Sequence, residues 1–131
     1  MCGIIGISSN KSVSSSIINS LKKLEYRGYD SAGIATLSNG FINEVKSEGR
    51  VENLENSFDL KNLSGNIGIG HVRWATHGVP NSINAHPHSS ENVSVVHNGI
   101  IENSTLLKKY LLSKGHKFKS CLLYTSPSPR D

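Results

Sequence analysis

The 131-residue chain is long enough for one compact domain, and its hydrophobic content of 36% and charged content of 18% suit a globular protein. No apolar run approaches the ~20 residues of a membrane-spanning helix, which argues against membrane insertion. The net charge is +4, but the basic residues are scattered, so we expect no nucleic-acid binding. The amino terminus lacks a secretory signal, which predicts a cytoplasmic protein with two free thiols.

The first predicted elements are a strand and a helix. The apolar run at residues 4–7 predicts a buried strand, which would hold the amino terminus in place. Between residues 11 and 24, apolar side chains recur at helical spacing with Ser and Lys on the other face. This pattern predicts an amphipathic helix packed on a sheet.

The next segment predicts a hairpin. Residues 25–31 place a glycine between two tyrosines and predict a loop, and residues 32–37 predict a strand. Asn39-Gly40 is typical of a tight hairpin turn, so residues 41–45 are expected to return as the partner strand. Residues 51–58 predict a short helix at best.

The second half of the chain begins with a glycine-rich strand at residues 66–74, where a backbone or a ligand is expected to come close. The polar residues 75–92 predict a long irregular loop of the kind that is often functional. A strand at 93–97 and a helix from the cap at Asn103 to Gly115 follow. Together these elements predict an α+β fold with a mostly antiparallel sheet. Residues 121–131 lack periodicity and predict a disordered tail.

Cys2 is the first candidate for chemistry. If Met1 is removed, Cys2 carries a thiol and a free α-amine, whose reference pKa values are about 8.5 and about 7.7–8.0. One residue would then supply both a nucleophile and its base. The alternative is that Cys2 is a small apolar residue at the start of a strand.

Four motifs occur together in chain order: CGIIG at 2–6, LEYRGYDSAG at 24–33, HVRWATHG at 71–78 and VHNGIIEN at 96–103. The set resembles the glutaminase domain of class II glutamine amidotransferases. Residues 74–77 and 84–88 further resemble the isomerising glutamine:fructose-6-phosphate aminotransferases within that class. The resemblance implies a partial glutamine amidotransferase type-2 domain over residues 2–120. Its fold would be an N-terminal-nucleophile hydrolase αββα sandwich with antiparallel sheets.

The resemblance also implies catalytic roles. Cys2 would attack the side-chain amide carbon of glutamine to form a thioester, while its α-amine accepts and returns the proton. Asn98 and Gly99 would donate hydrogen bonds to the oxyanion of the tetrahedral intermediate. Arg27 would set the geometry of the amine. The alternatives are a plain turn at Asn98-Gly99 and a loop ion pair between Arg27 and Asp30.

Four further residues would bind glutamine if the resemblance holds. Arg73 would hold the α-carboxylate through two parallel hydrogen bonds, and Thr76 and His77 would line the pocket. Trp74 would belong to a loop that closes over the substrate and helps to guide ammonia. The alternatives are a surface ion pair for Arg73 and a core position for Trp74.

The histidines suggest a metal site only weakly. The candidates are His71, His86, His88 and His97, of which His86 and His88 lie two residues apart. Zinc sites usually add cysteines or carboxylates at recurrent spacing, and none is suitably placed. We therefore expect no metal, and because no motif implies a nucleotide or a flavin, we expect no other cofactor.

The sequence departs from the family after Ser120. The family continues with an aspartate that binds the α-ammonium of glutamine, whereas residues 121–123 are Cys-Leu-Leu. Residues 121–131 are therefore interpreted as a non-native tail. The rest of the glutaminase domain and the sugar-isomerase domains that bind fructose 6-phosphate are also missing.

The sequence is thus interpreted as the glutaminase part of an amino-sugar enzyme. The complete enzyme would convert fructose 6-phosphate and glutamine to glucosamine 6-phosphate and glutamate, and would form homo-oligomers only at full length. The 131-residue chain is expected to be inactive alone. The alternatives are an acceptor-independent N-terminal-nucleophile amidohydrolase and a non-catalytic fragment.

Overall fold

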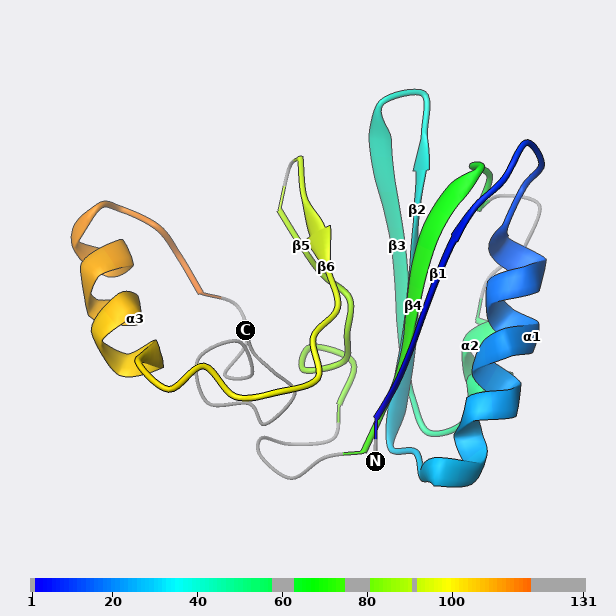
Figure 1. The fold of residues 1–131 in the computed structure, drawn as a ribbon, viewed down its shortest axis with the longest axis horizontal. Coiled ribbons are helices and arrows are strands. Elements are labelled where there is room, and N and C mark those ends of the chain that lie inside the picture. Colours follow the sequence, from blue (N-terminus) through cyan, green and yellow to red (C-terminus); the bar gives the residue numbers. More distant parts are fainter. Residues whose placement is uncertain (1, 58–62, 75–80, 91, 119–131) are drawn as a thin grey trace.

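A four-stranded antiparallel sheet forms the centre of the fold (Figure 1). The computed structural model describes residues 2–57, 63–74, 81–90 and 92–118. The strands follow the order β1-β4-β2-β3 across the sheet. Their bounds are Gly3–Ser8 for β1, Ser31–Ser38 for β2, Phe41–Glu48 for β3 and Ile67–Arg73 for β4. The predicted α+β fold with antiparallel pairing is therefore confirmed.

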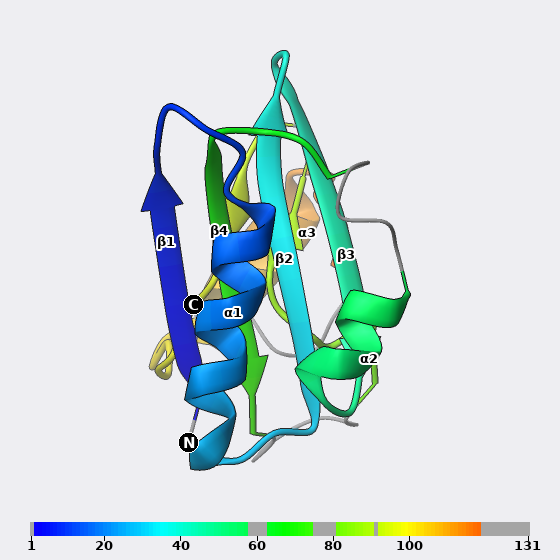
Figure 2. The ribbon, with the colours of Figure 1, turned by 90° about the vertical axis from the view of Figure 1, so that its right-hand side faces the viewer.

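Two helices cover one face of this sheet. Figure 2 shows α1 (Ser14–Leu24) lying over β1 and β4, and α2 (Val51–Asn56) lying against β3. Ile17 and Leu21 of α1 are fully buried there. A Cβ atom added at Gly68 or Gly70 would lie 2.6 Å from the Ile17 side chain. Glycine in β4 therefore allows α1 to approach the sheet closely. The sequence predicts that a backbone or a ligand will come close to this strand, and the group that does so is the Ile17 side chain of α1.

The predicted hairpin turn is also confirmed. Asn39 and Gly40 both have positive φ angles, of 52° and 80°, and Ser38 pairs with Phe41 across the two-residue loop. Positive φ at both central positions is the geometry of a type I′ turn, whose twist matches that of the strands it joins. This turn sets the register of β2 against β3.

The opposite face of the sheet carries a second, smaller layer. The strands β5 (His88–Ser89) and β6 (Ser94–Val95) pair antiparallel, and α3 (Ser104–Ser113) lies beyond them (Figure 1). The layers therefore run helix, sheet, sheet, helix. The two sheets meet at Gly33, where an added Cβ atom would lie 2.1 Å from the carbonyl oxygen of His86.

Polar contacts also join the two sheets. The Ser89 hydroxyl donates a hydrogen bond to the Glu44 carboxylate of β3. Lys46 Nζ lies 3.6 Å from Glu44 Oε1 and donates to the carbonyl oxygen of Ile83 at 3.4 Å. Side chains of β3 therefore hold the chain segments on both sides of residues 84–88.

Three local predictions need correction. Strand β1 is only partly buried, and Ile4 is 43% exposed, because β1 lies at the edge of the sheet and pairs with β4 alone. The segment predicted as a loop contains β5, whose two polar residues give no apolar signal. The strand predicted at 93–97 is reduced to β6.

The helix α3 begins after Asn103, as predicted, although the Asn103 side chain makes no capping hydrogen bond. None of its residues is buried. Within the described ranges, no helix is long and apolar enough to cross a membrane. The predicted tail at 121–131 lies outside the described residues, so the proposed boundary at residue 120 stays a prediction.

Candidate active site

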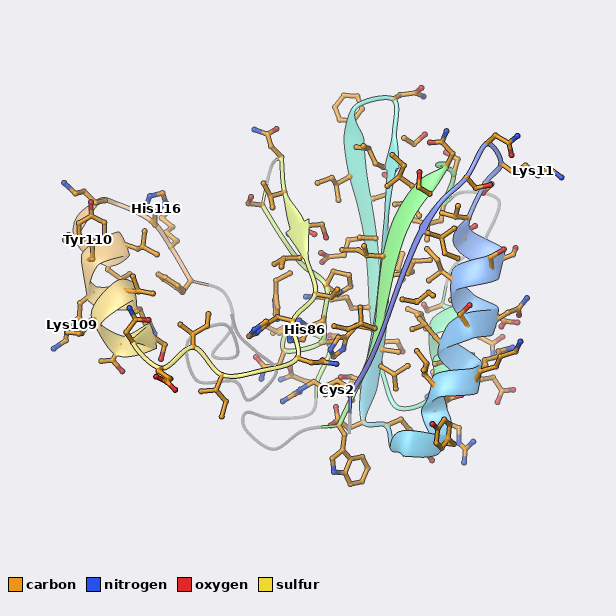
Figure 3. The ribbon with its side chains drawn as sticks, viewed as in Figure 1. Cys2, Lys11, His86, Lys109, Tyr110 and His116 are labelled. Atoms are coloured by element: carbon orange, nitrogen blue, oxygen red, sulfur yellow. The ribbon has the colours of Figure 1, made fainter. Side chains whose placement is uncertain are left out.

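Cys2 lies at the end of the sheet where β1 begins (Figure 3). Gly3 pairs with Val72, so Cys2 reaches the carboxyl end of β4. The Trp74 backbone N–H donates a hydrogen bond to Cys2 Sγ at 3.4 Å, and the thiol faces the Trp74 carbonyl oxygen at 3.7 Å. The peptide groups of Trp74 therefore hold the sulfur in place, and the half-buried Cys2 side chain stays within reach of a substrate.

Asn98 is anchored to the middle of the same strand. His71 of β4 is fully buried, and its Nε2 atom lies 2.8 Å from Asn98 Oδ1. Burial is the main cause that lowers the His71 pKa to about 4; Arg73 lowers it further, while the hydrogen bond to Asn98 opposes the shift. The imidazole is therefore neutral near pH 7 and carries one N–H.

Two more histidines stack on His71. The His71 and His86 rings are 4.4 Å apart with an interplanar angle of 25°, and His88 meets His86 edge-on at 4.5 Å. Burial lowers the pKa of His86 and lowers that of His88 to about 3, with smaller contributions from neighbouring charges. Neutral rings therefore fill the space between the two sheets on the face that α1 does not cover.

The described residues contain no group of three or more His, Cys, Asp and Glu side chains arranged to hold a metal ion. His71 uses Nε2 for Asn98, and its ring face lies against His86. The contacts of His71 are therefore a hydrogen bond and ring stacking. The absence of a metal or another cofactor stays a prediction.

Arg73 is buried and paired with a carboxylate. Its Nη1 atom lies 3.7 Å from Asp30 Oδ1, and the Asp30 N–H donates to the Arg73 carbonyl oxygen at 2.8 Å. The ion pair that the sequence offered as an alternative for Arg73 exists, but it is buried rather than at the surface. Asp30, which the sequence paired with Arg27, contacts Arg73. Removing Asp30 would take a carboxylate away from a buried guanidinium, which is costly.

Trp74 packs on a glycine. Its side chain is 49% exposed, so the alternative of a core position is wrong. A Cβ atom added at Gly28 would lie 2.8 Å from the Trp74 ring, and Gly28 has a φ of +116°. Both the backbone angle and the close contact require glycine at position 28.

The structure thus brings Cys2, Arg73 and Trp74 to one end of the sheet, and joins Asn98, with Gly99 beside it, to β4. Arg27 is the last residue of a 3-10 helix (Glu25–Arg27). Thr76 and His77 lie outside the described residues. The roles predicted for Arg27, Thr76 and His77 therefore stay predictions.

Sequence reasoning missed two partners, His71 for Asn98 and Asp30 for Arg73. Strand alternation gives a usable signal for the first. Gly68, Gly70 and Val72 face α1, so His71 and Arg73 must share the other face. No signal in the sequence shows that Asn98 would fold back onto that face.

This chain is similar in sequence to known proteins over most of its length. No family model matches the chain. The chain is 58% identical over 122 residues to a glutamine–fructose-6-phosphate aminotransferase (isomerizing) of Clostridium acetobutylicum, and 53% identical over 120 residues to one of Bartonella henselae. Each match covers 92% of this chain and 20% of the relative. The chain therefore spans about one fifth of the length of these curated relatives.

A solved structure shares the fold. The glutamine phosphoribosylpyrophosphate amidotransferase of Bacillus subtilis matches with a TM-score of 0.76 and 27% identity, over 92% of this chain and 27% of that chain. The predicted resemblance to glutamine amidotransferases and the predicted N-terminal-nucleophile hydrolase fold are confirmed.

Proposed function

We propose that this chain is the glutaminase part of an isomerising glutamine:fructose-6-phosphate aminotransferase. The observation that carries the proposal is the position of Cys2 Sγ, which is held by the Trp74 peptide groups at one end of β4, on the strand to which Asn98 is also anchored. The resemblance to relatives of that name over 92% of the chain supports it. Glutamine is the proposed substrate of this site.

The proposed reaction begins at the sulfur. Once Met1 has been removed, the Cys2 α-amine takes the thiol proton while Sγ attacks the side-chain carbonyl carbon of glutamine. The C–N bond of the resulting tetrahedral intermediate then breaks, and the amine returns the proton to the leaving nitrogen, which releases ammonia. Water attacks the remaining thioester, which restores the thiol and gives glutamate.

Asn98 and Gly99 are the proposed donors to the oxyanion. Asn98 is an exposed residue whose Oδ1 is held by His71, so Nδ2 is the side-chain atom proposed to donate to a substrate oxygen. The Gly99 N–H would supply the second hydrogen bond. Loss of one such donor typically lowers the rate by about 10²–10³-fold.

Arg73 is the proposed ligand of the glutamine α-carboxylate. Its planar guanidinium has five N–H donors in the geometry that suits bidentate binding of a carboxylate, and it lies at the same end of the sheet as Cys2. Trp74, Thr76 and His77 are proposed to complete the pocket. Arg27 is proposed to orient the Cys2 amine.

The rest of the activity would need a longer protein. Fructose 6-phosphate would bind to sugar-isomerase domains, and homo-oligomers would form through them. The 131-residue chain is expected to be inactive alone, because residues 121–123 are Cys-Leu-Leu where the resemblance leads us to expect an aspartate for the glutamine α-ammonium. The cytoplasmic location stays a prediction.

The test uses a host chimera, defined as the Clostridium acetobutylicum relative in which residues 2–118 of this chain replace the matching segment. We expect the chimera to hydrolyse glutamine and Cys2→Ala to abolish that activity. Ser113→Ala in the exposed part of α3 is the matched control in the same chimera, and it should leave glutamine hydrolysis unchanged.

Two further measurements complete this test. An extra residue that blocks the Cys2 amine should stop hydrolysis, and the protein mass should show that Met1 is absent. Glutaminase activity that survives Cys2→Ala would refute the proposal. Ammonia release without any amino-sugar formation in the active chimera would favour the acceptor-independent amidohydrolase.

A further inference from the structure

The hydrogen bond between His71 and Asn98 joins the middle of β4 to the segment that follows β6. We propose that His71 is a positioning residue, which fixes the Asn98 carboxamide so that Oδ1 faces the sheet and Nδ2 is presented to the substrate. This inference rests on the proposed function, in which Asn98 Nδ2 donates to the oxyanion. It assigns a role to a residue that never touches the substrate.

The direction of the hydrogen bond follows from burial. An amide oxygen can only accept, so Nε2 of His71 must carry the hydrogen if Oδ1 faces it at 2.8 Å. In that tautomer Nδ1 is a bare acceptor, and it is buried without a hydrogen-bond partner. A flipped Asn98 would require the hydrogen on Nδ1 instead. That arrangement would bury an N–H donor without an acceptor, which proteins rarely tolerate.

The surroundings keep the His71 ring in one orientation. On β4 it lies opposite Ile4 of β1 and Gly33 of β2, so it has a strand on either side. His86 stacks on the ring at 4.4 Å, and the His86 carbonyl oxygen abuts Gly33. A ring held in this way offers a fixed donor, in contrast to a flexible polar side chain.

The anchor is close to the nucleophile. Ile4 pairs with His71, and Cys2 lies two residues before Ile4 on the same strand face. Two residues of a strand span about 7 Å, so the backbone of Cys2 lies about that far along β1 from Ile4, the residue that pairs with His71. A carboxamide free to rotate would present Oδ1 to the oxyanion for part of the time. Fixing its orientation therefore favours the transition state.

The first test reads the tautomer directly in the 131-residue chain. We expect ¹⁵N NMR at pH 7 to show hydrogen on Nε2 of His71 and none on Nδ1. The signal is assigned by its loss in His71→Gln. Hydrogen on Nδ1 would reverse the orientation of Asn98 and overturn the inference, whatever the enzyme activity.

The second test measures glutamine hydrolysis in the host chimera. His71→Leu removes the donor and is expected to lower kcat by about 10-fold or more with little change in KM, since Asn98 acts on the transition state. His71→Gln keeps an N–H at the place of Nε2 and should retain most of kcat. The exposed His116→Leu is the matched control and should behave as the unchanged chimera.

A double variant separates positioning from a merely structural role. If His71 acts through Asn98, His71→Leu should cost nothing further once Asn98→Ala is present. Additive losses, or a kcat unaffected by His71→Leu, would refute the inference and leave the proposed function intact. Activity that survives both Cys2→Ala and Asn98→Ala would instead refute the proposed function.

Discussion

The two faces of the four-stranded sheet are built from the same strands but have opposite characters. In β4, Gly68 and Gly70 face α1 and accommodate the apolar side chains Ile17 and Leu21. The alternate residues His71 and Arg73 lie on the other face, where Asn98 and Asp30 are their polar partners. One face therefore provides the hydrophobic core, and the other holds the groups proposed to act on glutamine.

The difference has an energetic basis. Burying the neutral histidines and the Arg73–Asp30 pair removes polar groups from water, which costs free energy that their contacts only partly return. The apolar face gains free energy at about 25 cal/mol for each Å² of apolar surface buried. Substitutions on the apolar face should therefore lower the free energy of unfolding, whereas substitutions of the buried histidines should change how that free energy depends on pH.

The largest expected effect is on the apolar face. Leu21→Ala empties a fully buried position in α1 and should lower the free energy of unfolding by about 3–4 kcal/mol. Leu106→Ala in α3 makes the same chemical change where the side chain is 71% exposed, and should cost less than about 0.5 kcal/mol. Urea unfolding measures both. Equal losses would show that α3 is packed as tightly as α1.

The next effect probes the contact between the two sheets. Gly33→Ala would place Cβ 2.1 Å from the His86 carbonyl oxygen, so the layers must separate, at a cost of about 2–3 kcal/mol. Gly6→Ala lies on the same sheet face but meets nothing nearer than 3.9 Å, and should be close to neutral. A Gly33→Ala protein as stable as Gly6→Ala would contradict the direct contact between the sheets.

The sequence predicts the apolar face better than the polar one. Helical spacing of Val13, Ile17 and Leu21 suffices to place α1 on a sheet, because burial of one helix face is a local property of the pattern. Asn39-Gly40 likewise sets a turn from its own backbone preference. The sequence does not predict strand β5 itself, because two polar residues form a strand only through tertiary contacts.

The site was predicted in part for the same reason. Cys2, Arg73 and Asn98 were identified by motif, but their partners depend on contacts between distant segments. Asp30 and Arg73 are far apart in the sequence, so the spacing rules for helices and turns do not predict their contact. The sequence suggests His71 only as a weak metal-ligand candidate, whereas in the fold it contacts Asn98.

The third effect is on pH dependence, and it arises on the polar face alone. The pKa of His71 is lowered to about 4 and that of His88 to about 3, so below about pH 6.5 the unfolded chain binds protons that the folded chain does not. Their contribution to stability is therefore complete above pH 6.5 and is lost as pH falls. By pH 5 each buried histidine should cost up to about 2 kcal/mol.

Urea unfolding at pH 7 and pH 5 measures this loss. In His88→Gln the difference between the two pH values should shrink, since the half-buried His88 ring no longer takes up a proton on unfolding. Leu106→Ala should leave that difference unchanged, because it alters no titratable group. A wild-type stability that is constant between pH 7 and pH 5 would contradict neutral, buried histidines.

The smallest expected effect on stability comes from a substitution beside Trp74, which directly follows β4. Gly28→Ala introduces a Cβ at a φ of +116° and 2.8 Å from the indole, which should displace the ring and cost about 1 kcal/mol. Trp74 is the single tryptophan in the chain, so its fluorescence reports the change without a label. Emission should shift to longer wavelength, and iodide quenching should increase.

Gly40→Ala is the matched control for this last substitution. It also places alanine at a positive φ, of +80°, but meets no atom within 4 Å. It should therefore lower stability by a similar amount and leave the tryptophan emission unchanged, because the strain is far from the indole. If both variants have the same emission spectrum, the indole does not rest on Gly28, and its packing there does not help to fix the Trp74 residue whose backbone N–H donates to Cys2 Sγ.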